Sequence, residues 1–215
     1  MWFNRIIAAV LPFMPKGLVW IFSKRYIAGK KIQDAIDVAK DYNSNGMVVT
    51  IDLLGEFITK LSEAEENKNT YLDIIEKVEA SEVEGNYSLK PTMFGLLLDK
   101  DKCYTFIREI VAKAASYNNF VRIDMEDSQC VDLEIEMFRK LKAEFPKNVG
   151  LVLQAYLKRT SKDIEDMLDL HNEEVPLNYR LCKGIYVESE KIAYKKYEEI
   201  NKQFLINLET MFKNG

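Results

Sequence analysis

The apolar and polar positions of this 215-residue chain follow two alternating periods along most of its length. Short apolar, β-branched runs are typical of buried strands, and longer segments with apolar residues at helical spacing are typical of amphipathic helices. The apolar runs predict five strands, at residues 47–54, 85–91, 120–125, 149–157 and 177–184. The helical spacing predicts six helices, at residues 30–45, 62–81, 101–118, 128–145, 160–172 and 188–213.

Local signals mark where two of these helices should begin. Ser62, with Glu65 three residues later, predicts a capping box at the start of the helix at 62–81. Thr160 and Ser161 are expected to cap the helix that they open. The connections between the predicted elements are short.

Strands and helices alternate five times from residue 46 onward, which is the pattern of right-handed βαβ units and a parallel sheet. We therefore expect two parts, an N-terminal helical segment at residues 1–45 and an α/β domain at residues 46–215. The chain is long enough to bury one sizeable core.

The first 22 residues are apolar enough to raise the question of a membrane segment. Prolines and Lys16-Gly17 break the run, and each half is too short to span a bilayer. We expect a helical hairpin that is buried or docked on the surface. Peripheral membrane contact is an alternative, through the aromatic side chains Trp2, Phe3, Trp20 and Phe22.

Composition narrows the possible functions. The net charge is −4 and the pI is about 5.3, so no basic field favours nucleic acid. Cys103, Cys130 and Cys182 lie far apart without a CxxC pattern, which favours free thiols in a reducing, cytoplasmic compartment. A single histidine, His171, excludes a zinc site built on several histidines of this chain. Small molecules or proteins are the expected partners, and no oligomeric state is predicted.

Polar residues interrupt each apolar run near its carboxyl end. They are Asp52, Lys90, Asp124, Gln154, and the pair Arg180 and Lys183. The carboxyl ends of parallel strands meet at one edge, where sites of α/β proteins concentrate. We therefore predict one shared site. The alternative is a set of ion pairs that fills the mouth of a barrel core.

Arg180 and Lys183 cannot both point to the same face of an unbroken strand, because side chains alternate with a period of two. If both cations serve one site, the strand must end before Lys183. Gly184 suits such a bend. Neither a G-x-G-x-x-G fingerprint nor a Walker loop occurs, so a Rossmann site and a P-loop are not supported.

Five segments together resemble the proline dehydrogenase family, flavin enzymes that oxidise L-proline. They are RYIAGKKIQDAIDVAKDYNSNGMVVTIDLLGE, SLKPT, VRIDMED, LVLQAYLKRT and YRLCKGIYVE, and they extend over nearly the whole chain. The resemblance implies a flavin-binding variant of the (β/α)8 TIM barrel, with FAD as cofactor. It also implies oxidation of L-proline to 1-pyrroline-5-carboxylate, the first step of proline catabolism, with quinone as an electron acceptor.

The resemblance also implies roles for individual residues. Gln154, Arg180, Lys183 and Gly184 would hold the flavin, with Arg180 donating near its reactive nitrogen. Lys90 would pair with the substrate carboxylate, Asp124 would shape the proline pocket, and Tyr186 would pack near the substrate. Glu56 would close the site by pairing with an arginine of the family's last helix.

The chain departs from the family in length, since only about five of the eight βα units are present. The family's Y-x-x-R-R-x-x-E-N-type motif does not occur either. Three interpretations follow: a cytoplasmic or peripherally membrane-bound proline dehydrogenase completed by further chain, a non-catalytic fragment that binds flavin weakly, and another flavin or phosphate-ligand barrel.

Overall fold

The structure is a computed structural model that describes residues 14–15, 17, 23, 26–55 and 58–214. The expected N-terminal hairpin, the four aromatic residues named for the alternative of membrane contact, and Glu56 lie outside the described residues. The chain forms two compact units, one of residues 1–49 with 81–84 and one of residues 50–80 with 85–215. Within the described ranges, no helix is both long enough and apolar enough to cross a membrane.

The first unit contains helix α3 (Ile32–Ser44), as the helical spacing predicts. Its start is stabilised by Asp34, whose Oδ2 accepts hydrogen bonds from the backbone N–H groups of Lys30 and Lys31, both at 3.0 Å. Asn43 joins the two pieces of the unit. Its amide nitrogen donates to the carbonyl of Glu84 at 2.9 Å, and its amide oxygen accepts from the N–H of the same residue at 2.8 Å.

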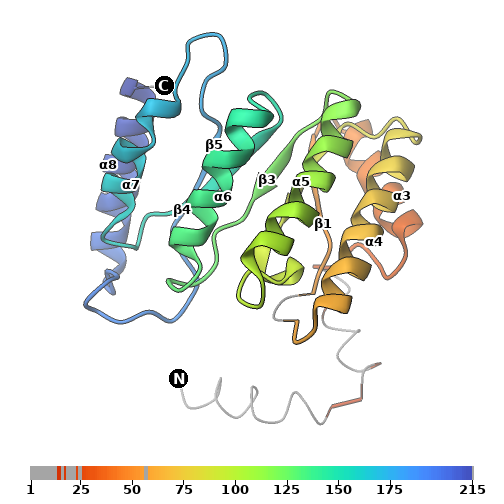
Figure 1. The fold of residues 1–215 in the computed structure, drawn as a ribbon, viewed down its shortest axis with the longest axis horizontal. Coiled ribbons are helices and arrows are strands. Elements are labelled where there is room, and N and C mark those ends of the chain that lie inside the picture. Colours follow the sequence, from red (N-terminus) through yellow and green to blue (C-terminus); the bar gives the residue numbers. More distant parts are fainter. Residues whose placement is uncertain (1–13, 16, 18–22, 24–25, 56–57, 215) are drawn as a thin grey trace. The chain divides into compact units, whose positions relative to one another are not determined.

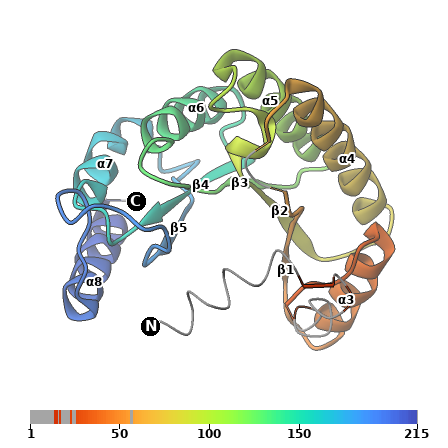
Figure 2. The ribbon, with the colours of Figure 1, turned by 90° about the horizontal axis from the view of Figure 1, so that it is seen from below.

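The second unit is built on a five-stranded sheet in the order β1-β2-β3-β4-β5, with β2 to β5 paired in parallel (Figure 1 and Figure 2). The strands are β1 (Val49–Asp52), β2 (Gly85–Leu89), β3 (Val121–Ile123), β4 (Val149–Gln154) and β5 (Tyr179–Cys182). All five predicted strands are present. The sequential order confirms the succession of βαβ units.

Helices line one side of this sheet, which curves so that they lie on its convex side (Figure 2). They are α4 (Leu61–Glu79), α5 (Lys100–Ser116), α6 (Val131–Glu144), α7 (Thr160–Asp166) and α8 (Tyr197–Asn214). Two short 3₁₀ helices, η2 (Pro91–Phe94) and η3 (Leu168–Leu170), follow β2 and α7. The arrangement is an open, partial (β/α) barrel.

The two faces of the sheet differ because neighbouring side chains on a strand point to opposite sides. Leu89, Ile123 and Leu151 are aligned across β2, β3 and β4 and are fully buried in the apolar core. The next row on the other face aligns Ser88, Arg122 and Gly150. The concave face therefore carries polar side chains, and these show where along the strands a polar site can begin.

Three predictions about helix caps are wrong. Helix α4 has Lys60 at its N-cap position, without a side-chain cap, so Ser62 and Glu65 form no capping box. The hydroxyl of Thr160 donates instead to the carbonyl of Gln154 at 2.6 Å. That of Ser161 donates to Oδ1 of Asn207 at 2.6 Å. These hydroxyls tie α7 to its neighbours rather than capping it.

The closing helix begins at Tyr197, not at residue 188 as its composition predicts. Ala193 forms an antiparallel bridge with Leu157, and the N–H of Tyr194 donates to the carbonyl of Tyr156 at 2.8 Å. Because these backbone groups bond to the loop after β4, they are not available for a helix.

Candidate functional site at the carboxyl ends of the strands

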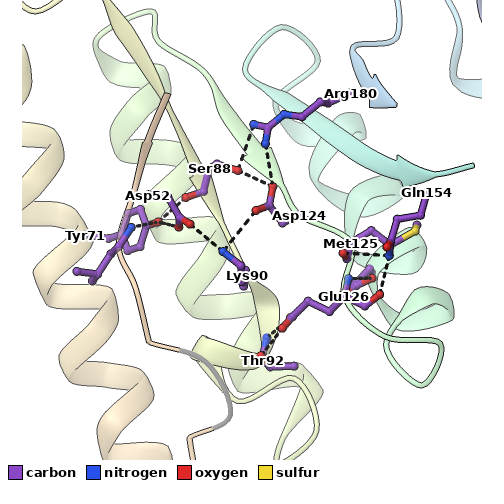
Figure 3. A network of polar contacts seen from close by, with 12 residues as sticks. Asp52, Tyr71, Ser88, Lys90, Thr92, Asp124, Met125, Glu126, Gln154 and Arg180 are labelled. Carbon is purple, nitrogen blue, oxygen red and sulfur yellow. Dashed lines mark hydrogen bonds and ion pairs between the residues drawn. The ribbon is translucent and has the colours of Figure 1, made fainter. Parts of the chain in front are cut away.

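The centre of the site is Lys90, the residue directly after β2. Its Nζ lies 2.7 Å from Oδ2 of Asp52 and 3.6 Å from Oδ2 of Asp124 (Figure 3). Asp52 ends β1 and Asp124 follows β3, so three neighbouring strand ends supply this triplet. The three side chains are between 17% and 27% exposed, which places them at a surface where a ligand can reach them.

Arg180 of β5 extends the triplet across the sheet. Its guanidinium lies 3.6 Å from Oδ1 of Asp124 and 3.4 Å from the hydroxyl of Ser88, which itself donates to Asp124 at 2.5 Å. The resulting sequence of charges is Asp52, Lys90, Asp124 and Arg180, alternating in sign (Figure 3). The polar strand ends predicted to share one site are therefore together for these four residues. We call them the rim cluster.

Asp52 is held from the helix side by Tyr71 of α4. The Tyr71 hydroxyl lies 3.3 Å from Oδ1 of Asp52, and it also contacts the carbonyl of Ser88. Burial raises the pKa of Asp52 despite the hydrogen bond and the charge of Lys90. Burial, together with the charge of Asp52, raises the pKa of Tyr71 well above its usual value, so the phenol stays neutral and can donate.

Gln154, at the end of β4, is 2% exposed. Its Nε2 donates to the backbone carbonyls of Glu126 at 2.7 Å and Met125 at 3.2 Å. Both donor hydrogens of the amide are thus directed to the loop after β3. In this arrangement Gln154 fixes that loop, and its role toward a flavin stays a prediction.

Lys183 and Gly184 lie beyond the end of β5 at Cys182, so the strand ends between Arg180 and Lys183. The Lys183 ammonium contacts Tyr197, 2.9 Å from its hydroxyl and 4.5 Å from its ring centre. Gly184 has a φ of +109°, and an added Cβ would lie 2.1 Å from the ring of Tyr156. Only glycine fits there.

Tyr186 is half-buried and lies on the same loop as Gly184. Its expected place beside a substrate stays a prediction. Among the described residues, the site therefore falls into two groups. The rim cluster is one, and the exposed loop that begins at Lys183 is the other.

The alternating charges of the rim cluster suit a small zwitterion. A ligand with one carboxylate and one ammonium group can exchange partners with the existing ion pairs without leaving a charge unpaired. Arg180 is 36% exposed and retains N–H groups beyond its two contacts, so it can also donate to a bound ring. The exposed cation of Lys183 and the bare backbone of Gly184 suit a larger anionic cofactor.

Sequence reasoning missed two residues of this site. Ser88 could have been found, because it lies two positions before Lys90 and so shares its face of the strand. Tyr71 could not, since nothing in the pattern of α4 shows which of its side chains reaches over the strand ends.

The model of the proline dehydrogenase family matches residues 35–201 of this chain. Proline dehydrogenase 1 of Bacillus subtilis (strain 168) is 34% identical over 194 residues, which are 89% of this chain and 62% of that protein. Proline dehydrogenase of Deinococcus radiodurans is 33% identical over 190 residues, 86% of this chain and 60% of that protein. The chain thus spans about three fifths of the length of these relatives.

Solved structures support the fold. Proline utilization A (PutA) from Bdellovibrio bacteriovorus superposes with a TM-score of 0.83 at 23% identity, over 93% of this chain and 25% of that one. PutA from Bradyrhizobium japonicum gives 0.70 at 17% identity, over 84% of this chain and 21% of that one. At these identities the likeness concerns the fold, a curled parallel sheet that forms part of a TIM barrel.

Proposed function

We propose, from the premise that this chain belongs to the proline dehydrogenase family, that its rim cluster binds L-proline for oxidation to 1-pyrroline-5-carboxylate. The observation that carries the proposal is the placement of Lys90 between two carboxylates, with Arg180 next in line. The chain spans about three fifths of the length of its relatives. We therefore propose that its residues supply part of the proline site, and that further chain completes the barrel.

Proline carries both charges that the rim cluster can receive. Its carboxylate would take Lys90 as partner, in place of part of the pairing that Lys90 now makes with Asp52 and Asp124. Its ring nitrogen would lie toward the two carboxylates released in this exchange. Such a fixed orientation brings C5, the carbon to be oxidised, to one defined place above the strand ends.

The reaction breaks the C5–H bond, whose electron pair leaves with the hydrogen as a hydride, and forms a C=N bond as the ring nitrogen loses a proton. A bound FAD would accept the hydride. Asp52 is suited to take the proton from nitrogen, because burial raises its pKa and so makes it a better base than an exposed carboxylate.

Arg180, Lys183 and Gly184 are the residues that we expect to hold the flavin. Arg180 would stabilise negative charge through its free N–H groups. Lys183 would exchange the Tyr197 hydroxyl for an acidic group of the cofactor. Electrons would pass on to quinone or another acceptor, in the cytoplasm or at the membrane surface.

The test is to purify the protein, record its visible spectrum and add L-proline. We expect a flavin spectrum that bleaches, and proline-dependent reduction of a dye. Arg180→Met should lower the rate of flavin reduction much more than it lowers the free energy of unfolding. Arg139→Met, on the surface of α6, is the matched control that should leave flavin reduction unchanged.

A colourless protein without proline-dependent dye reduction would contradict the proposal and favour the non-catalytic interpretation. Equal loss of folding and of flavin reduction in Arg180→Met would instead show that the cluster only supports the fold. Bleaching by another secondary amine but not by L-proline would overturn the choice of substrate.

A further inference from the structure

Beneath the rim cluster lies a buried carboxylate that the proposed reaction does not use. Glu126 is two residues after Asp124 and is 1% exposed. Its Oε2 accepts the backbone N–H of Thr92 at 2.8 Å, and its Oε1 accepts the Thr92 hydroxyl at 2.6 Å. Thr92 is two residues after Lys90 and is 4% exposed. The contact therefore joins the chain just past two members of the rim cluster (Figure 3).

The backbone of Glu126 is fixed as firmly as its side chain. Its N–H donates to the side-chain carboxyl group of Glu134 on α6, with the two oxygens at 3.1 and 3.3 Å. Its carbonyl accepts the Gln154 amide at 2.7 Å. The loop after β3 is thus held by α6 and by the end of β4, and it presents the Glu126 carboxylate to the turn after β2.

One buried backbone N–H group of that turn needs a hydrogen-bond acceptor from outside the turn. Lys90 is the N-cap residue of η2 but provides no side-chain cap, and Pro91 has no N–H group. Thr92 therefore carries the first free N–H of the 3₁₀ helix, a donor that needs an acceptor when it is buried. Glu126 supplies that acceptor from a neighbouring strand end, and it binds the Thr92 hydroxyl with its second oxygen.

The direction of the Lys90 side chain depends on this turn, because its backbone conformation is set where β2 ends and η2 begins. Asp124 and Glu126 lie on one short segment, and Lys90 and Thr92 on another. The contact between Thr92 and Glu126 joins these two segments. It therefore also fixes the position of Lys90 relative to Asp124. Buried hydrogen bonds to a charged group are among the stronger polar contacts in proteins.

We infer that Glu126 is a positioning residue, which through Thr92 holds the ammonium group of Lys90 at its place between Asp52 and Asp124. The link acts on the geometry of the rim cluster itself. Its consequence for catalysis, a correctly placed partner for the proline carboxylate, rests on the proposed function.

A purely structural role would stabilise the whole unit and leave the Lys90 ammonium no more exposed after mutation. The test therefore compares individual lysines. The protein is treated with a limiting amount of acetic anhydride, and the acetylation rate of each lysine is measured by mass spectrometry. Lys68 and Lys142 are internal references, because both are largely buried by contacts that do not involve Thr92.

Thr92→Val removes the hydroxyl but keeps the shape and the N–H group, and Thr92→Ser keeps both donors. We expect Thr92→Val to raise the acetylation rate of Lys90 roughly tenfold, the effect of losing one hydrogen bond to a buried carboxylate. Lys68 and Lys142 should react as in the wild type, and Thr92→Ser should restore the wild-type rate at Lys90. Glu126→Gln, with one acceptor oxygen left, should show the same selective increase.

An unchanged Lys90 rate in folded Thr92→Val would overturn the inference, as would an equal rise at all three lysines. A second arm measures steady-state kinetics, where Thr92→Val should raise KM for L-proline more than it lowers kcat, with Thr92→Ser as the rescue. If the wild type does not oxidise proline, the proposed function fails, while the acetylation rates still decide the role of Glu126.

Discussion

The two ends of the sheet in the second unit present very different surfaces. At the β1–β3 end, Asp52, Lys90 and Asp124 are largely shielded and engaged with one another. At the β5 end, the loop after Cys182 exposes Ile185 at 86% and Val187 at 99%. The first end is organised by contacts within this chain, whereas the second exposes apolar side chains that such contacts do not cover.

This difference shows how a site can be partly prepared in an open barrel. Ion pairs between neighbouring strand ends need only the strands that carry them, so Asp52, Lys90 and Asp124 can pair within this chain. In a closed barrel further strands would cover the β5 end, and here β5, like β1, is an edge of the described sheet. We therefore predict that polar substitutions have the larger effect at the β1–β3 end, and that changes to exposed apolar side chains have the larger effect at the β5 end.

The largest effect should come from Gly184→Ala. This variant tests whether the backbone at the β5 end is closely packed, although side chains there are exposed. The new Cβ would lie 2.1 Å from the Tyr156 ring, at a φ of +109° that disfavours any side chain. We expect the free energy of unfolding to fall by about 3 kcal/mol, from strain and the displaced ring together. Urea unfolding followed by circular dichroism measures this.

Gly46→Ala is the matched control for this prediction. Its φ is +74°, yet nothing lies within 4 Å of the added Cβ. It should cost only about 1 kcal/mol, the effect of the backbone conformation alone. Equal losses in the two variants would mean that the Gly184 backbone is not closely packed, and that the β5 end is loose throughout.

The next largest effect concerns the charges. Lys90→Met leaves Asp52 and Asp124 facing each other without the cation between them, and we expect a loss of about 2 kcal/mol at pH 7. Lys183→Met, at the β5 end, removes an exposed cation and should leave the free energy of unfolding almost unchanged. Urea midpoints of the two variants, measured side by side, test the contrast. A larger loss for Lys183→Met would reverse it.

A smaller effect depends on pH. Burial, and secondarily the charge of Glu126, raises the pKa of Glu134 well above its usual 4.5. The folded protein then keeps a proton that the unfolded chain releases, so stability falls as the pH rises above about 4.5 toward the folded pKa. Glu134→Gln cannot release a proton, so its stability relative to the wild type should be higher at pH 8 than at pH 5.

Unfolding at pH 5 and pH 8 gives the measurement for this prediction. The advantage of Glu134→Gln should be small at pH 5 and larger at pH 8. Glu165→Gln, a change of an exposed acid on α7, should follow the wild type at both values. A Glu134→Gln advantage that is the same at both values would show that no proton is involved.

The strands and their order could be predicted from sequence, because buried parallel strands are apolar throughout and their chemistry appears only at the ends. Asp52, Lys90, Asp124 and Arg180 were recognised by this position alone. The start of α8 could not be predicted. Residues 188–196 have a helical composition, but Ala193 pairs with Leu157, a contact that a local pattern does not contain.

The support beneath the site was also out of reach of sequence reasoning. Thr92 and Glu126 each lie two residues past a predicted site residue, yet their pairing depends on how two loops meet in space. Gln154 illustrates the same limit, since its place at a strand end was predicted while its bonds to the carbonyls of Met125 and Glu126 were not. Strand ends can be located from periodicity, whereas contacts between loops require the fold.

The smallest effect on stability should come from Phe212→Ser, at the β5 end. Phe212 of α8 is 78% exposed, and it borders an apolar groove of about 190 Å³ that Tyr179 and Leu181 of β5 also line. We expect the free energy of unfolding to change by no more than about 0.5 kcal/mol, because little apolar surface is lost from the core. Sedimentation should show less self-association, since exposed apolar patches promote it.

Phe138→Ser, at a fully buried position, should instead be strongly destabilising. A similar loss in both variants would mean that Phe212 packs into the groove in solution, and that the β5 end is covered by this chain after all.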